Sequence, residues 1–179
     1  MPSTDFECKD SYDQFLEFSR VTHENWLLPD RKDYVPFGVT QEQWVAPFLE
    51  PRLDATVPRD VIRVFEVVRG CMIYSWFFYP LATLGLEQCT RIAEFAVRER
   101  CRVLQREPEN FFVNLETLVT AGVISADEEP RWQALRGLRN DRSHLKGYML
   151  VDPGQAVDFL KTTAELVNAL FSGPATIAT

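Results

Sequence analysis

Residues 152–174 read DPGQAVDFLKTTAELVNALFSGP and contain the start, the body and the end of one amphipathic helix. Asp152 is a residue type that caps helix N-termini, and Pro153 suits the first helical position. Gly173 and Pro174 are typical of a helix end. Between them runs a mostly apolar stripe with helical spacing, formed by Phe159, Leu160, Thr163, Leu166, Val167 and Leu170. Such a helix must bury its apolar face against other elements, so this stretch predicts a packed helical domain.

The sequence upstream of this stretch predicts two long helices in succession. Pro58 suits the start of a helix over residues 58–79. Pro80 then breaks or kinks the chain before a second helix over residues 81–104. The inward side of this second helix is expected at Ala93, Val97 and Leu104.

Two further helices are expected between residues 108 and 145. Pro108 can start the first, and Gly122 ends it with a left-handed residue. Its predicted inner face contains Phe111, Phe112, Leu115, Leu118 and Val119. Ser125 and Glu128 match the S-x-x-E capping box, and placing the next helix start at Asp127 keeps Pro130 out of the helix interior.

No strand-like alternation competes with these helices, so the predicted class is all-α, a helical bundle over residues 58–173. Residues 1–57 form an irregular, partly helical N-terminal extension that is interrupted by Pro29, Pro36, Pro47 and Pro51 and has two candidate helices, at residues 9–20 and 40–50. Its aromatic residues predict that the extension packs on the bundle, and these are Trp26, Phe37, Trp44 and Phe48.

Composition restricts the location and the chemistry of the chain. The first 15 residues contain acidic side chains where a secretory signal needs a basic start and an apolar run, so we expect a cytoplasmic protein. Its four cysteines are then expected as thiols. Residues 70–86 carry no charge, but Pro80 interrupts them and charges crowd both flanks, which favours buried bundle helices over a membrane span.

The charge and the histidine count exclude two kinds of site. A net charge of −7 argues against a protein that coats nucleic acid nonspecifically, because that mode depends on many phosphate contacts. With two histidines and no C-x-x-C pair, a structural metal site is not expected. A local anion site remains compatible with both observations.

Residues 135–148, LRGLRNDRSHLKGY, concentrate positive charge and one of the two histidines. On an ideal helix with Trp132 at zero, Leu135 lies at about 300° and Arg139 at about 340°. Arg139 therefore projects from a face that ought to be buried, which is costly unless the guanidinium is paired or opens onto a cavity or a partner. The alternative is a set of solvated cations that interact with the dipole of a helix C-terminus.

The order Arg139, Asn140, Asp141, Arg142, Ser143, His144 resembles the signature of the HEPN family, an arginine followed after four to six residues by a histidine. The flanking LETLVTAGVI, the acidic linker and the final amphipathic helix are also similar to the family pattern, over roughly residues 60–172. The resemblance implies a HEPN-like four-helix up-and-down bundle that dimerises and brings two motifs together. Many members are metal-independent endoribonucleases, often toxins or antiviral effectors.

By this resemblance, Arg139 would hold the scissile phosphate of RNA, His144 would transfer the proton, and Asn140 would support them. No metal and no cofactor is implied, because the 2′-hydroxyl of RNA is itself the nucleophile, and the products would be a 2′,3′-cyclic phosphate and a 5′-hydroxyl. A twofold dimer supplies one His144 as base and one as acid. Nearby cations are candidates for phosphate contacts or for solvated positions, namely Arg136, Arg142 and Lys146.

Other interpretations remain open. The family also contains noncatalytic modules, so the chain is alternatively a helical module that binds a protein or nucleotide partner, and the −7 charge alone fits an acidic immunity protein. An antitoxin or regulatory protein is a possible partner of a nuclease. One toxin subgroup has a tyrosine two residues after the histidine, where this chain has Lys146 and only later Tyr148. Charged residues at positions 87, 91 and 94 either support the site or form an exposed ion-paired face.

Overall fold

The computed structural model describes residues 11–13, 16–19, 21–30, 40–143 and 151–173, and it describes only the backbone of 11–13, 16–19 and 141–143. Most of this part is helical. Its helices are α1 Gln41–Leu49, α2 Arg59–Tyr74, α3 Pro80–Val103, α4 Phe111–Thr120, α5 Glu129–Ser143 and α6 Pro153–Ser172. The predicted all-α class is confirmed.

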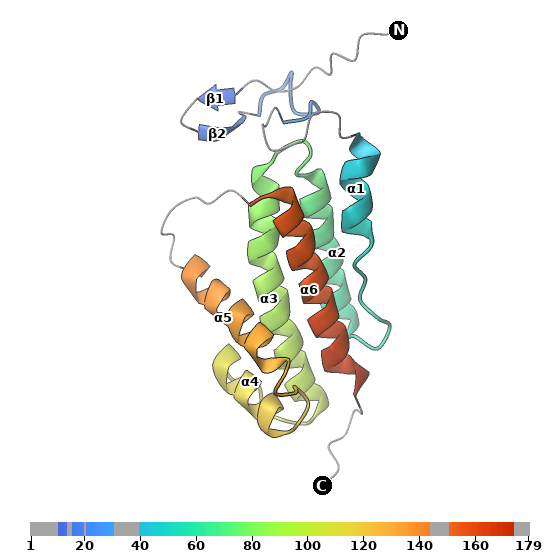
Figure 1. Ribbon diagram of the computed structural model, residues 1–179, viewed down its shortest axis with the longest axis vertical. Coiled ribbons are helices and arrows are strands. Elements are labelled where there is room, and N and C mark those ends of the chain that lie inside the picture. Colours follow the sequence, from blue (N-terminus) through green and yellow to red (C-terminus); the bar gives the residue numbers. More distant parts are fainter. Residues whose placement is uncertain (1–10, 14–15, 20, 31–39, 144–150, 174–179) are drawn as a thin grey trace.

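Helix α3 is the central element, because α2, α4, α5 and α6 all pack on it. Figure 1 shows α2, α3 and α6 as long neighbouring helices, with α1 beside α2 and with α4 and α5 against the lower part of α3. One apolar core runs through all six helices of the described part. Its largest fully buried side chains include Phe48, Phe65, Met72, Ile92, Leu115, Trp132 and Leu160.

The helix ends follow the signals in the sequence. The Asp152 carboxylate accepts a hydrogen bond from the Gly154 backbone N–H at 2.8 Å, and α6 begins at Pro153 as predicted. Gly122 follows the end of α4 with a φ of 68°, a conformation that glycine adopts without a Cβ penalty. The Ser125 and Glu128 side chains form the expected capping hydrogen bonds, but α5 itself starts at Glu129, two residues after the predicted start.

Helices α2 and α3 approach closely because α3 has a glycine where they meet. A Cβ atom at Gly85 would lie 2.5 Å from Cγ of the buried Met72 on α2. That separation is too short for two carbon atoms in van der Waals contact. Any larger residue at this position therefore forces the helix pair apart or displaces Met72.

The uncharged run at residues 70–86 is divided between two helices. It contains the end of α2, the turn at residues 75–79 and the start of α3, with Pro80 as the first residue of α3. Within the described part of the chain, no helix combines the length and the apolar character that a membrane crossing requires. The expectation of buried bundle helices agrees with this finding.

In the described part of the N-terminal extension, α1 packs on α2 and α6. Thr40 and Gln43 form a reciprocal capping box at its start. Trp44 and Phe48 are buried, and the Trp44 indole donates a hydrogen bond to the Ile73 carbonyl of α2 at 3.2 Å. Trp26 is instead 56% exposed, so its expected packing role is wrong, and Phe37 lies outside the described residues.

The helix predicted at residues 9–20 is also wrong. The structure has two short antiparallel strands there, β1 Ser11–Asp13 and β2 Leu16–Ser19, with Ser11 opposite Ser19 and Asp13 opposite Leu16. A helix of about twelve residues is marginal in water without tertiary packing. The aromatic residues of this stretch suit a strand as well as a helix, so its helical periodicity is a weak signal.

Replacing Tyr79 by phenylalanine is expected to destabilise the fold by about 1–3 kcal/mol. The buried Tyr79 hydroxyl donates a hydrogen bond of 2.6 Å to the Val151 carbonyl, which ties the start of α6 to the turn between α2 and α3. The substitution leaves that buried carbonyl without its donor. Urea unfolding measures the loss, and Tyr74→Phe, at a position that is 63% exposed, is the control that should change stability by less than about 0.5 kcal/mol. Equal stability of the two variants would refute the assigned role of this hydrogen bond.

Candidate functional site

The inner face of α5 positions the arginine of the motif. Trp132 and Leu135 are 1% and 2% exposed, so the part of α5 that faces the core is the part that the helical wheel predicts. Arg139 follows Leu135 by one turn, and its angle around the helix axis lies between the angles of Leu135 and Trp132. Its aliphatic stem therefore starts at the protein interior, and its charged end needs a partner there.

That partner is Glu94 of α3. The Arg139 Nε lies 3.1 Å from Oε2 of Glu94, and Nη2 lies 3.4 Å from Oε1. The two side chains are 38% and 32% exposed, so the pair sits at the edge of the core and still meets solvent. Glu94 therefore forms an ion pair with the arginine of the motif.

Arg136 is half-buried and lies on the side of α5 that is next to α4. Its Nε donates a hydrogen bond to Oε1 of Gln133 at 2.8 Å, and its Cζ lies 5.1 Å from the centre of the Phe112 ring. Phe112 is 43% exposed, so the prediction that it faces the core is wrong. An arginine above an exposed ring is a combination that binds phosphates and stacks on nucleotide bases.

The remaining motif residues are placed only in part. Asn140 is exposed on α5, which leaves its amide accessible to a ligand. The side chain of Arg142, together with His144 and Lys146, lies outside the described residues. The convergence of Arg139 with His144 therefore stays a prediction from the sequence.

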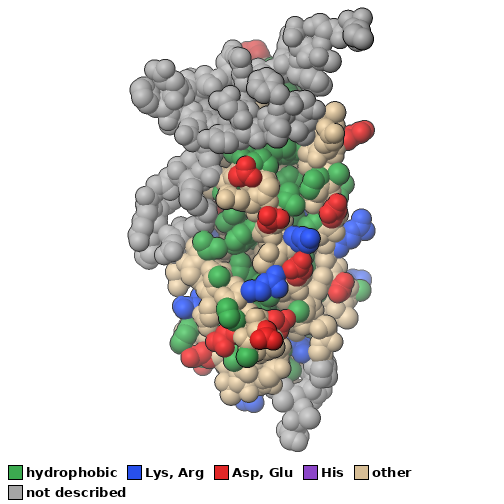
Figure 2. All heavy atoms as spheres, in the orientation of Figure 1, with side chains coloured by type: hydrophobic (Ala, Val, Ile, Leu, Met, Phe, Trp, Pro, Cys, Tyr) green, Lys and Arg blue, Asp and Glu red, His purple; other side chains and the backbone are tan. Residues whose placement is uncertain are grey.

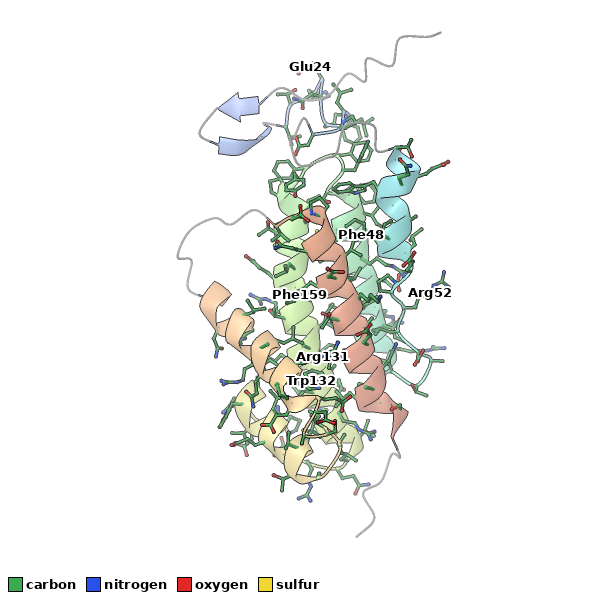
Figure 3. The ribbon with its side chains drawn as sticks, viewed as in Figure 1. Glu24, Phe48, Arg52, Arg131, Trp132 and Phe159 are labelled. Atoms are coloured by element: carbon green, nitrogen blue, oxygen red, sulfur yellow. The ribbon has the colours of Figure 1, made fainter. Side chains whose placement is uncertain are left out.

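A cleft of about 470 Å³ separates α5 from α6. Figure 1 shows α5 diverging from α6, and Figure 3 shows Phe159 on α6 above the point where Arg131 of α5 comes close to that helix. Arg131 pairs with Glu165 of α6 at 2.8 Å. The apolar lining includes Leu86, Leu135, Leu138 and Phe159. Sequence reasoning missed this cleft, because each of these residues also fits a closed core.

A second hollow, of about 570 Å³, lies where α3 ends. It is lined by Arg98, Arg102 and Arg106 together with Glu107 and Glu109. Arg102 pairs with Glu99, and Arg98 stacks over Phe95 with 5.0 Å between Cζ and the ring centre. Arginines at every fourth position signal this cluster in the sequence, but the turn that folds Arg106 back beside α3 is a tertiary feature.

Metal and thiol chemistry find no support in the described residues. They contain no group of three or more histidine, cysteine, aspartate or glutamate side chains able to hold a metal ion. Burial raises the pKa of the Cys89 thiol to about 12 and also raises the pKa values of Cys71 and Cys101. These thiols stay protonated near neutral pH and are poor nucleophiles.

On the face of the bundle that carries α6, the described residues mix charges of both signs (Figure 2). Figure 2 shows Lys and Arg side chains interspersed with Asp and Glu side chains on this face. Arg131 lies on the side of α5 that borders α6, where it pairs with Glu165. Arg136 lies about 140° from Arg131 around the axis of α5. Arg136 is therefore on a different side of α5 from the pair that Arg131 forms with Glu165.

The chain shows no significant match to a known protein family, to a curated protein or to a solved structure.

Proposed function

We propose that the protein is a metal-independent endoribonuclease of HEPN type that acts as a homodimer. The observation that carries this proposal is the placement of Arg139. Its side chain emerges from the inner face of α5, pairs with Glu94 through the guanidinium and is 38% exposed. A cation placed at such an edge is oriented by the protein and still accessible to an anion.

The proposed reaction uses the nucleophile that RNA supplies. The 2′-oxygen forms a bond to phosphorus and loses its proton to one His144, while the bond from phosphorus to the 5′-oxygen breaks and that oxygen takes a proton from the second His144. Arg139 stabilises the additional negative charge on the phosphorane. The products are a 2′,3′-cyclic phosphate and a 5′-hydroxyl.

The surroundings of Arg139 also suit an RNA ligand. Arg136 adds a second cation one turn away on α5, and Phe112 below it offers an exposed ring for base stacking. Asn140 adds an exposed amide. Arg142 and Lys146 complete the proposed set of substrate contacts on the basis of the sequence. A cytoplasmic toxin or antiviral effector that a second protein restrains is the biological role that fits such an activity.

Replacing Arg139 by alanine is expected to lower RNA cleavage about 100-fold, because the transition state loses its cationic contact. The measurement is gel analysis of mixed RNAs incubated with purified protein and a chelator. Arg131→Ala is the matched control, since Arg131 is also a partly exposed arginine of α5 that pairs with a glutamate of a neighbouring helix. Equal cleavage by the two variants would rule out the assigned role of Arg139, and cleavage by neither variant nor wild type would rule out the nuclease.

One observation favours a second function, a noncatalytic interaction module. Helix α2 exposes Val64, Val67 and Tyr74, at 38%, 72% and 63%, on one side. Their spacing of three and seven residues forms a stripe along the helix, and exposed apolar stripes of this kind mark protein contacts. Absence of RNA cleavage together with loss of a protein complex in Val67→Glu would favour the module.

A further inference from the structure

The ion pair between Glu94 and Arg139 uses the donors that a phosphate would need. Glu94 binds the edge of the guanidinium formed by Nε and Nη2, at 3.1 Å and 3.4 Å. A guanidinium binds a phosphate through two parallel hydrogen bonds from an edge of this kind. Glu94 and a phosphodiester therefore compete for the same side of Arg139.

The pair is weak enough for such an exchange. Both side chains are about one-third exposed, and ion pairs in contact with water contribute little to stability because solvent screens them. A carboxylate in this position also removes the net positive charge that attracts an RNA strand. The charge of Arg139 is thus masked while Glu94 holds it.

The neighbours of Glu94 on α3 offer it other partners. Arg91 precedes it by three residues and Arg98 follows it by four, and both are exposed. Residues three and four apart lie next to each other on a helix surface, so a rotated Glu94 carboxylate meets a cation on either side. Release of Arg139 then leaves no isolated negative charge on α3.

We infer that Glu94 is a positioning residue that gates the phosphate site. It fixes the Arg139 side chain in the absence of RNA, and an incoming phosphodiester displaces it onto Arg91 or Arg98. This inference rests on the proposed function, because RNA is the ligand that it assumes. Glu94 lowers affinity for RNA and thereby favours strands that contact several cations at once over single phosphates.

The test is the affinity of a short 2′-O-methyl RNA, which cannot be cleaved, measured by fluorescence anisotropy at several salt concentrations. Glu94→Gln keeps an oxygen that accepts the Nε hydrogen bond and removes the charge, so we expect about threefold to tenfold tighter binding at low salt. The logarithm of the affinity of Glu94→Gln for RNA should also fall more steeply with the logarithm of the salt concentration. In this variant Arg139 can neutralise a phosphate, and each such contact releases counterions from the RNA. Glu94→Asp keeps the charge and should bind like the wild type.

Two controls separate the gate from a general charge effect. Glu165→Gln removes the same charge from the pair with Arg131 and should leave the affinity unchanged. In the double variant Glu94→Gln, Arg139→Gln the increase in RNA affinity should disappear, because Glu94 acts on RNA binding through Arg139. Thermal unfolding of each variant confirms that it is folded before binding is measured.

The outcomes distinguish this inference from the nuclease. The proposed role of Glu94 is overturned if Glu94→Gln binds RNA no more tightly than the wild type. It is also overturned if the increase in RNA affinity persists when Arg139 is replaced. Both conclusions hold even when the wild type cleaves RNA. Tighter binding that depends on Arg139, in a protein that cleaves no RNA, supports the gate and overturns the nuclease. In a cleaving enzyme the gate predicts a lower KM for Glu94→Gln with kcat little changed, whereas a structural role would lower kcat and stability together.

Discussion

Replacing His144 by alanine is expected to reduce RNA cleavage by about 10²- to 10⁴-fold. The proposed reaction needs one proton removed from the 2′-hydroxyl and one delivered to the 5′-oxygen, and general acid–base catalysis contributes about this factor. The sequence contains one other histidine, His23, which is exposed on the N-terminal extension. His144 is the histidine that belongs to the motif.

A mixing experiment tests whether two chains share one site. Wild-type and His144→Ala chains are coexpressed with different tags at a series of ratios, and cleavage is plotted against the wild-type fraction. A composite site needs both copies of His144, so activity should fall with the square of that fraction, to about one quarter in an equal mixture. Chains that act independently should retain about one half.

The control for this experiment is His23→Ala, which should give the RNA cleavage of the wild type at every mixing ratio. A linear dependence on the wild-type fraction would refute the composite site while leaving a nuclease of independent chains. Full activity of the purified His144→Ala protein would refute any proton-transfer role for His144. The pH dependence adds a check, because a histidine base and a histidine acid predict a bell-shaped profile.

Replacing Trp132 by alanine is expected to destabilise the protein by about 3–5 kcal/mol. Trp132 is 1% exposed and is the largest of the fully buried side chains in the described part. It joins α5 to the core formed around α3, and truncation leaves a cavity where the indole was. Urea unfolding monitored by circular dichroism measures the loss.

Trp26→Ala is the matched control for this prediction. It removes the same indole from a position that is 56% exposed, so its effect should stay within about 0.5 kcal/mol. Trp132→Phe keeps an aromatic ring and should cost less than Trp132→Ala. Equal effects of Trp132→Ala and Trp26→Ala would show that α5 is not anchored through this side chain, and the position of Arg139 would then lose its structural basis.

The start of α6 and the end of α4 could be predicted from local signals, whereas the helix predicted over residues 58–79 ends at Tyr74. Asp152 and Pro153 set the start of α6, and Gly122 ends α4 with a positive φ, because caps and left-handed residues act within one helical turn. The position of Arg139 on the inner side of α5 followed from helical geometry alone. The helix expected at residues 9–20 was wrong, because the chain forms β1 and β2 there, and a segment of about twelve residues is marginal as an isolated helix.

The partners of these residues could not be predicted in the same way. Glu94 and Arg139 are 45 residues apart, and only the packing of α5 on α3 brings them within hydrogen-bonding distance. The exposure of Phe112 and the cleft between α5 and α6 likewise depend on how the helices cross. The sequence by itself determined the all-α class and the position of an arginine on the inner face of one helix. Only the tertiary structure decided what that arginine binds, because helix crossing depends on side-chain packing between segments that are distant in the chain.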